Sequence, residues 1–366
     1  MKVDGRLTRT IWLAADGRSV EVIDQTRLPH AFTTLRLAFM EEAAHAIRSM
    51  QVRGAPLIGA TAAYGVALAM AADPSDSALD RAVAVLGETR PTAVNLHWAL
   101  AEMQAVLRNR PQAERADLAY AKAAAICDED VVTNRAIGGH GLALFREAYE
   151  AKGGPKAQGR PLRVLTHCNA GWLACVDWGT ALAPIYLAHD EGMPLEVWVD
   201  ETRPRTQGAL TAWELKSHGV PHKVIVDNAG GLLMRQGQVD LCIVGTDRVA
   251  ANGDVANKIG TYLKALAARD NGLPFYVALP GPTIDWSLPS GDAIPIEERA
   301  EEEVTLVTGR TADGGLATVS PYPAGTRASN AGFDVTPARL VTALVTERGV
   351  APASREGLLG LYPERA

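Results

Sequence analysis

The stretch Leu241–Tyr262, LCIVGTDRVAANGDVANKIGTY, decides the expected fold of this chain. It opens with an apolar run typical of a buried parallel strand, which stops at Gly245. Polar and charged side chains follow closely: Asp247, Arg248, Asn252, Asp254, Asn257 and Lys258. This is typical of the carboxyl edge of an open α/β sheet, where ligands bind. A solvated loop before an amphipathic helix is the alternative, but the interleaved Ala250, Ala251, Ala256 and Ile259 favour a packed polar pocket.

Strand and helix patterns alternate after residue 160. Five apolar runs are expected to be strands, with helices between them: Val164–Thr166, Glu196–Val199, Lys223–Val226, Asp240–Val244 and Pro274–Ala278. This alternation predicts an α/β fold, a Rossmann-like parallel sheet with helices on both faces. Neither a G-x-G-x-x-G after a strand nor a Walker A sequence is present, so the pattern carries no evidence for NAD.

The part before this sheet is predicted to be a smaller, mainly helical domain, residues 1–151. It starts with a hairpin, Arg9–Leu13 and Val20–Ile23 around an Asp16-Gly17 turn, and continues with helices. The last of them covers Ala113–Ala151, with an interruption at Gly138-Gly139. Residues 152–160 (KGGPKAQGR) read as a linker, and 161–366 as the catalytic domain. Thr336-Pro337 is expected to start a final helix.

Composition limits the classes of function. Hydrophobic residues make up 47% and charged residues 21% of the 366 residues, as in soluble globular proteins. The net charge of −6 gives no general attraction to nucleic acid or an anionic membrane, so an anion site must be built locally. The four cysteines have neither disulfide-framework nor zinc-ribbon spacing. We find no signal peptide and no run of membrane-spanning length, and expect a cytoplasmic protein.

Two helix starts are candidate anion sites. Arg53 precedes Gly54, Ala55 and Pro56, and proline fits the first turn of a helix. The free N–H groups of Gly54 and Ala55, with the charge of Arg53, would suit a phosphate. Arg90 stands before another helix start and is a second candidate. An ordinary capped helix and a surface arginine are the competing interpretations.

Cys168 is the candidate functional thiol, and an inert core cysteine is the competing interpretation. It follows the strand ending in Thr166-His167 and precedes a turn of small residues. Helix-start amides at such a position can lower the pKa of a thiol, whereas dry surroundings keep it neutral. His167 is not expected to pair with the thiol, because adjacent strand residues point to opposite faces.

Two further strand ends supply polar groups. After the strand near residue 199, Arg203, Arg205 and Gln207 are candidates to hold a phosphorylated, hydroxylated ligand, and Glu201 could pair with an arginine.

In the stretch Leu241–Tyr262, burial of Asp247 would raise its pKa and let it keep a proton. A structural aspartate that caps the following turn is the competing interpretation. Lys258 could neutralise a phosphate, and Asn257 could bond a sugar hydroxyl. No His, Cys and Asp set has metal-ligand spacing. One thiol, one carboxyl and several basic groups suit proton relocation on a small phosphorylated substrate without a cofactor.

Seven segments together resemble the methylthioribose-1-phosphate isomerase family, in the superfamily of initiation-factor 2B alpha, beta and delta subunits. They are Val52–Tyr64, Arg90–Leu100, Leu165–Ala174, Asp200–Leu215, Val244–Tyr262, Phe275–Arg299 and Phe333–Pro337. The resemblance implies a homodimer that converts S-methyl-5-thio-α-D-ribose 1-phosphate to the ribulose 1-phosphate in methionine salvage, without a cofactor. It implies that Cys168 is the catalytic thiol and Asp247 the proton donor. It places around the substrate Arg53, Gly54, Ala55, Arg90, Gln207, Asn257 and Lys258.

The chain departs from the family pattern at several positions. The segment from Gln207 to Trp213, QGALTAW, is one residue short and lacks an Arg, Pro282 replaces a Ser, and Ala170 and Trp172 are less typical. These departures make 5-deoxyribose 1-phosphate a plausible related substrate. The alternatives are a ribose-1,5-bisphosphate isomerase and a non-catalytic regulatory subunit of the initiation-factor type. No dedicated basic set for a second phosphate is evident, and the presence of both Cys168 and Asp247 argues against a non-catalytic protein.

Overall fold

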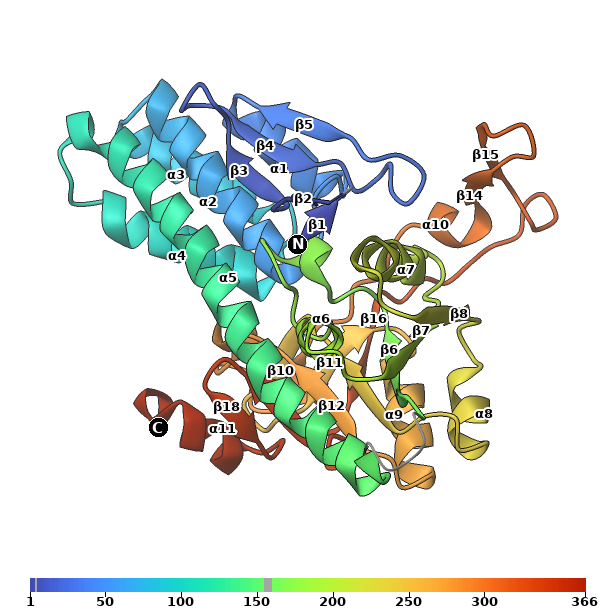
Figure 1. The fold of residues 1–366 in the computed structure, drawn as a ribbon. Helices are drawn as coiled ribbons and strands as arrows, with labels where there is room; N and C mark the ends of the chain where they lie inside the picture. Colours follow the sequence, from blue (N-terminus) through green and yellow to red (C-terminus); the bar gives the residue numbers. More distant parts are fainter. Residues whose placement is uncertain (4, 155–159) are drawn as a thin grey trace.

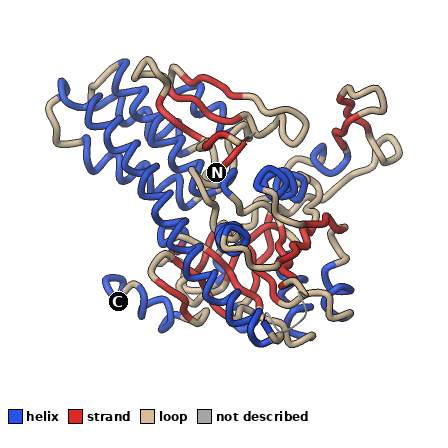
Figure 2. Tube along the Cα trace, viewed as in Figure 1, coloured by secondary structure: helices blue, strands red, loops and turns tan. Residues whose placement is uncertain are grey.

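The computed structural model describes residues 1–3, 5–154 and 160–366. Helices gather at one end of the molecule and a large sheet at the other, with the long helix α5 running between them (Figures 1 and 2). Most of the predicted linker, residues 155–159, lies outside the described residues, and the division into domains stays a prediction.

The large sheet has seven strands in the order β18-β17-β12-β9-β6-β7-β8. All five predicted strands belong to it: β6 (Leu162–His167), β7 (Leu195–Asp200), β8 (His222–Ile225), β9 (Leu241–Val244) and β12 (Phe275–Ala278). They pair in parallel, as does β17 (Ala343–Thr346) on β12, and only β18 (Gly349–Ala351) is antiparallel to its neighbour. The α/β fold class is confirmed.

Both faces of this sheet are covered by helices. Val164 in β6 joins a core with helices α5 (Gln112–Ala151), α6 (Ala183–Asp190) and α7 (Gln207–His218). Its neighbour Leu165 joins the opposite core with α8 (Gly230–Arg235), α9 (Thr261–Asp270) and α11 (Arg355–Leu361). Because successive strand residues face opposite sides, continuous apolar runs are what a sheet buried on both faces requires.

The order of the strands reverses between β6 and β9. From β6 the chain proceeds to β7 and β8 on one side, and then crosses to β9 on the other side of β6. Val164 pairs with Leu241 and Leu165 with Cys242, so the two strand ends lie next to each other. A reversal of this kind leaves a crevice at the carboxyl ends of the two strands.

A second, four-stranded sheet follows β9, in the order β13-β10-β11-β16. Its strands are β10 (Arg248–Ala250), β11 (Val255–Lys258), β13 (Ile284–Asp285) and β16 (Phe333–Thr336). The stretch Leu241–Tyr262 is therefore a strand, an antiparallel hairpin and the start of α9, rather than a loop before a helix.

The N-terminal part contains the predicted hairpin, β3 (Ile11–Leu13) and β4 (Val20–Ile23), extended by β5 (Thr34–Leu37). A short pair, β1 (Lys2–Val3) and β2 (Arg6–Leu7), precedes it. The helices are α1 (Met40–Arg48), α2 (Ala55–Ala72), α3 (Asp76–Gly87), α4 (Val94–Leu107) and the first half of α5.

Helix α2 corrects one expectation, because its length and apolar composition would suffice to span a membrane. Its side chains are mostly buried inside the protein, where it packs against α1, α3, α4 and α5. We therefore interpret it as a core helix, which is apolar all round for the same physical reason as a membrane helix.

One prediction near the C-terminus is wrong. No helix starts at Thr336-Pro337: β16 ends there, a 3-10 turn covers Ala338–Leu340, and β17 follows. Proline suits the first turn of a 3-10 turn as well as that of a helix, so the local signal was ambiguous. The short α10 (Glu302–Thr305) leads into the hairpin β14 (Val307–Arg310) and β15 (Leu316–Val319), which extends away from the rest of the molecule (Figure 1).

The predicted interruption of α5 at Gly138-Gly139 is wrong, since α5 is continuous from Gln112 to Ala151. The glycines instead allow α6 to approach closely. A Cβ atom at Gly138 would lie 2.9 Å from the Leu187 side chain, and one at Gly141 would lie 2.7 Å from that of Pro184. A Cβ at Gly139 would have no atom within 4 Å.

Alanine substitutions at these glycines should therefore have opposite effects on stability. Gly141→Ala should lower the free energy of unfolding by about 1–3 kcal/mol, because the added methyl overpacks the α5–α6 contact. Gly139→Ala, on the exposed side of the same helix, should raise it by about 0.5–1 kcal/mol through helix propensity. Urea unfolding measures both, and equal effects of the two substitutions would contradict the close approach.

Candidate active site

Cys168 lies immediately beyond β6 in a left-handed backbone conformation, with φ of 69°. Its N–H donates to Thr202 Oγ1 at 3.1 Å, and its carbonyl accepts from Thr211 Oγ1 at 2.8 Å. These contacts hold a conformation that residues other than glycine seldom adopt. No α-helix starts directly after Cys168; only a 3-10 turn, Trp172–Ala174, follows. Burial raises the pKa of the thiol, while Arg53 and Lys258 favour the thiolate, so dry surroundings outweigh the expected lowering.

The loop after Cys168 is organised by Glu214, a buried side chain of α7 that sequence reasoning missed. The Glu214 carboxylate accepts four hydrogen bonds, from Asn169 Nδ2 at 2.8 Å, Trp172 N at 2.9 Å, Leu173 N at 3.1 Å and the Tyr186 hydroxyl at 2.8 Å. A Cβ atom at Gly171 would lie 1.9 Å from Glu214 Oε2, so glycine is required there. Burial raises the pKa of Glu214, and these donors oppose the rise.

Arg53 is fixed by the same loop. Its guanidinium donates to the Asn169 side-chain oxygen at 2.5 Å and to the Asn169 carbonyl at 2.9 Å. The next residue, Gly54, caps α2 with φ of 91°, and a Cβ there would lie 2.3 Å from Ala174 Cα. Backbone therefore packs on backbone at the start of α2, and only glycine fits.

The hairpin β10–β11 supplies Asn257 and Lys258, and Asp247 lies directly before β10. Burial raises the pKa of Asp247, and the nearby Lys258 and Arg90 oppose the rise. Burial also lowers the pKa of Lys258, whose ammonium lies 4.8 Å from the centre of the Phe333 ring. Asn257 Nδ2 donates to Thr261 Oγ1 at 3.0 Å.

The remaining predicted residues have mixed partners. Arg90 lies 3.6 Å from Glu297, and burial lowers the pKa of its guanidinium. Gln207, the first residue of α7, is buried, and its Oε1 has no hydrogen-bond partner among the described residues. Arg205 pairs with Glu303 at 3.2 Å.

Glu201 corrects an expectation, because its Oε1 accepts from the backbone N–H groups of Thr202 at 2.6 Å and Gly208 at 3.0 Å rather than from an arginine. It therefore holds the start of α7 against the end of β7. The local sequence, rich in arginine, did not indicate this backbone contact.

All nine predicted site residues line one cavity of about 580 Å³: Arg53, Gly54, Ala55, Arg90, Cys168, Gln207, Asp247, Asn257 and Lys258. The wall also contains residues that were not predicted, among them Thr180, Thr246, Arg299 and Phe333. Arg299 and Phe333 come from segments far along the chain, and only the resemblance, which includes both, pointed toward them. Among the residues that the structure describes, no group of three His, Cys, Asp or Glu side chains could hold a metal ion.

Comparisons with known proteins identify the family. Residues 51–353 match the model of the initiation factor 2 subunit family. Two curated relatives named methylthioribose-1-phosphate isomerase, from Rhodospirillum rubrum and Paramagnetospirillum magneticum, are each 64% identical to this chain. The alignments cover all of this chain and 94% and 100% of those relatives.

The chain belongs to the methylthioribose-1-phosphate isomerases of the initiation factor 2 subunit family. The predicted resemblance is confirmed. Among solved structures, 5-methylthioribose 1-phosphate isomerase from Pyrococcus horikoshii is similar, with a TM-score of 0.83, 40% identity and coverage of 98% of this chain and 97% of that one. A translation initiation factor eIF-2B delta subunit from A. fulgidus has a TM-score of 0.79 and 36% identity, with coverage of 98% and 100%.

Two of the departures from the family pattern have packing roles in this chain. Trp172 is buried, with its ring centre 6.0 Å from that of Trp213. A Cβ atom at Gly245 would lie 2.5 Å from the Ala170 methyl, so these two residues pack closely. The shortened segment after Gln207 leaves α7 continuous to His218, and Pro282 lies in a 3-10 turn beside the cavity-lining Thr283.

The raised pKa of Asp247 predicts a pH-dependent contribution to stability. The folded state holds this proton above the ordinary carboxyl pKa of 3.8, whereas the unfolded chain loses it at the ordinary value. As pH rises past 3.8, the unfolded state therefore binds fewer protons, and Asp247 increasingly destabilises the fold. Asp247→Asn should gain stability relative to wild type over this range and level off above the folded-state pKa. Urea unfolding from about pH 4 to pH 8 measures the difference, and a flat difference would contradict the assignment.

Proposed function

We propose that this chain is an aldose–ketose isomerase that converts S-methyl-5-thio-α-D-ribose 1-phosphate to S-methyl-5-thio-D-ribulose 1-phosphate, a step of methionine salvage. The observation that carries the proposal is that Cys168 and Asp247, delivered from the ends of β6 and β9, line the same cavity as several basic groups. The names of relatives 64% identical over the full chain give the substrate.

The phosphate would bind at the start of α2. Arg53 supplies charge, and the backbone N–H groups of Gly54 and Ala55 supply a helix N-terminus, which favours anions. Lys258 adds a second cation to the same cavity. These groups create a local positive field in a chain of net charge −6, which meets the need for a locally built anion site.

Sugar hydroxyls would be held by Gln207 and Asn257, with Arg90 as a further contact. The buried, unpartnered Oε1 of Gln207 supports this role, because an unsatisfied buried acceptor costs free energy that a ligand hydroxyl would recover. Asn257 Nδ2 is already engaged by Thr261, which fixes the orientation of the amide in the cavity.

The substrate chemistry explains why an acid is required. The anomeric carbon carries the phosphate ester, so the sugar ring cannot open to a free aldehyde by the ordinary route. Asp247, whose burial favours the protonated form, would donate its proton to the ring oxygen as the bond from that oxygen to C1 breaks. Hydrogen then moves from C2 to C1, and the C2 hydroxyl becomes the ketone as Asp247 regains a proton.

Cys168 would lie beside this hydrogen transfer. A thiol with a raised pKa is a poor base at rest, which favours a role in stabilising the transition state of a direct hydride shift. The competing route removes the C2 proton to form a phosphoenolate, with the thiolate as base. The cations Arg53 and Lys258, which favour the thiolate, support that second route.

We further propose that the protein is a cytoplasmic homodimer, as the family resemblance implies. Sedimentation of the purified chain tests the dimer. The cavity and its basic lining independently support a small phosphorylated substrate.

Turnover of a substrate panel tests the function. Wild type should isomerise methylthioribose 1-phosphate, and less well 5-deoxyribose 1-phosphate, whereas ribose 1,5-bisphosphate should be poor. Cys168→Ser and Asp247→Asn should each lower kcat by about 10²–10⁴-fold while remaining folded.

Matched controls are available in α5, where Cys127 is buried in the helical core and Asp128 is exposed. Cys127→Ser and Asp128→Asn should retain turnover. Absence of wild-type turnover on every sugar phosphate would favour the initiation-factor type of regulatory protein instead.

Isotope transfer separates the two routes. A hydride shift carries the C2 hydrogen to C1 without exchange, so product formed in D₂O should contain no deuterium at C1. The enolate route would place solvent deuterium there. Nuclear magnetic resonance of the product measures the incorporation, and substantial deuterium at C1 would rule out the direct shift.

A further inference from the structure

A buried cluster of charged side chains lies behind Cys168 and has no part in the chemistry proposed above. His167 ends β6, Asp200 ends β7 opposite it in the parallel register, and Lys264 reaches them from α9. All three are buried, Asp200 completely. Burial of such groups is costly unless they are paired with good geometry, so the cluster indicates a constraint on the site beyond simple packing.

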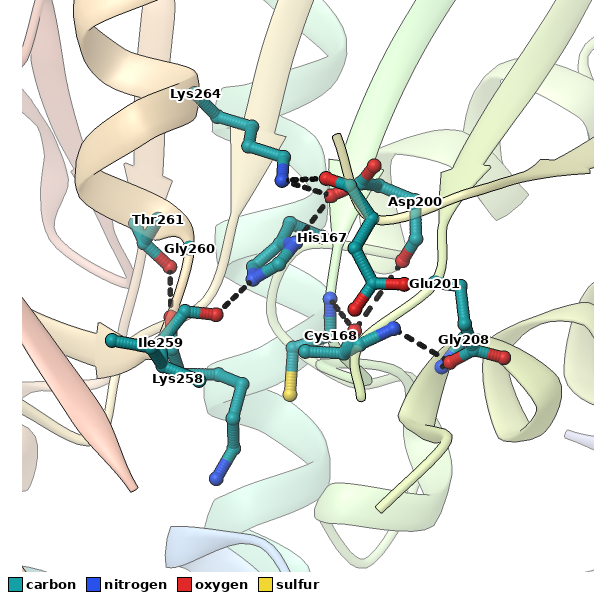
Figure 3. Close-up of polar contacts among 12 residues, drawn as sticks. His167, Cys168, Asp200, Glu201, Gly208, Lys258, Ile259, Gly260, Thr261 and Lys264 are labelled. Carbon is teal, nitrogen blue, oxygen red and sulfur yellow. Dashed lines mark hydrogen bonds and ion pairs between the residues drawn. The ribbon is translucent and has the colours of Figure 1, made fainter. Parts of the chain in front are cut away.

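His167 makes a contact with each of its ring nitrogens. Nδ1 lies 2.5 Å from Asp200 Oδ2, which also accepts from Lys264 Nζ at 2.8 Å. Nε2 donates to the carbonyl oxygen of Ile259 at 2.9 Å, since a carbonyl can only accept. The two ring nitrogens thus face oxygen atoms of two different elements, β7 and the turn that follows β11 (Figure 3).

The turn that receives Nε2 is built to accept the ring. Gly260 has φ of 101°, and a Cβ there would lie 3.0 Å from His167 Cε1. Its N–H donates to Asp334 Oδ2 at 2.7 Å. Thr261 Oγ1 donates to the Lys258 carbonyl at 2.7 Å, so the turn is also fixed on the side of Lys258.

His167 directly precedes Cys168, and Ile259 directly follows Lys258. The hydrogen bond between His167 and Ile259 therefore connects the two site residues through their neighbours. In Figure 3 the side chains of Cys168 and Lys258 extend to the same side of the cluster, away from Lys264. Both line the cavity. We propose that His167 is a positioning residue that fixes the end of β6, which carries Cys168, relative to the β11–α9 turn, which carries Lys258.

This inference rests on the proposed function, which assigns Cys168 to the hydrogen transfer and Lys258 to phosphate binding. A displacement of about 1 Å between a reacting group and a bound substrate can cost about 10²-fold in rate. The contact with Ile259 is the part of the cluster that links the two site residues. The contact with Asp200 links β6 to its neighbour β7 and, through Lys264, to α9, but it makes no bond to the turn beside Lys258.

Two substitutions of His167 separate these contacts. The amide nitrogen of glutamine can take the place of Nε2 and donate to Ile259, whereas that of asparagine can take only the place of Nδ1. His167→Asn should lower kcat by about 10–100-fold with a smaller change in KM, because the thiol and the bound phosphate lose their fixed separation. His167→Gln should stay within about threefold of wild type in kcat, since the link to Ile259 is restored.

A second readout does not depend on the substrate. Iodoacetate and iodoacetamide alkylate a thiol by the same displacement of iodide, but only iodoacetate is negatively charged. The ratio of their rates at Cys168, followed by mass spectrometry of the peptide that contains it, therefore reports on the cations beside the thiol. His167→Asn should lower this ratio by about threefold as Lys258 moves, and His167→Gln should preserve it.

His218→Asn is the matched control, since His218 at the end of α7 pairs with Asp190 of α6 at 2.8 Å and does not line the cavity. It should leave both kcat and the alkylation ratio unchanged. Circular dichroism establishes that each variant is folded.

The proposal is supported if the asparagine variant loses kcat and ratio together while the glutamine variant retains both. It is overturned if folded His167→Asn keeps the wild-type ratio, or if folded His167→Gln loses kcat tenfold. Should asparagine prevent folding, the glutamine variant alone still decides. If wild type turns over no sugar phosphate, the proposed function fails, and the alkylation ratio still tests the positioning of Lys258.

Discussion

The parallel pairing of β6 with β9, at the point where the strand order reverses, is the constraint on which the site depends. Val164 opposite Leu241 sets the register, and each strand then runs on to its own polar turn. Cys168 and Asp247 are far apart in the sequence, yet both turns open into the same crevice. A shift of register would displace one turn along the other and would also turn the buried side chains of the strand to the wrong face.

Low polarity around this crevice determines how its ionisable groups behave. Burial raises the pKa of Cys168 and Asp247 and lowers that of Lys258, so each group is pushed toward its neutral form. The attraction of Lys258 for each of the other two groups opposes this effect. Burial thus favours the protonated form of Asp247, whereas the neighbouring Cys168 and Asp247 favour the charged form of Lys258. The surrounding buried network, with Glu214 at its centre, keeps the groups in place because its hydrogen bonds are satisfied.

Sequence patterns predicted the sheet well and some local features poorly. The prediction of five strands after residue 160 is confirmed, because short continuous apolar runs bounded by turns are typical of buried strands. The break at Gly138-Gly139 was wrong because glycine lowers helix propensity and also permits close helix contact, and only the position of α6 distinguishes the two. The prediction of a helix from Thr336-Pro337 was wrong for a similar reason, since a 3-10 turn and an α-helix can begin with the same residues.

The sequence by itself determined which residue types end each strand, and therefore that a thiol, a carboxyl and basic groups would be available at one edge of a sheet. Tertiary structure alone decided their partners. Asn169 holds Arg53, Glu214 holds Asn169, and His167 reaches Ile259, each across a long separation along the chain. Such pairs leave no periodic pattern in the sequence, because they depend on the distances between elements that packing brings together rather than on the conformation of any one element.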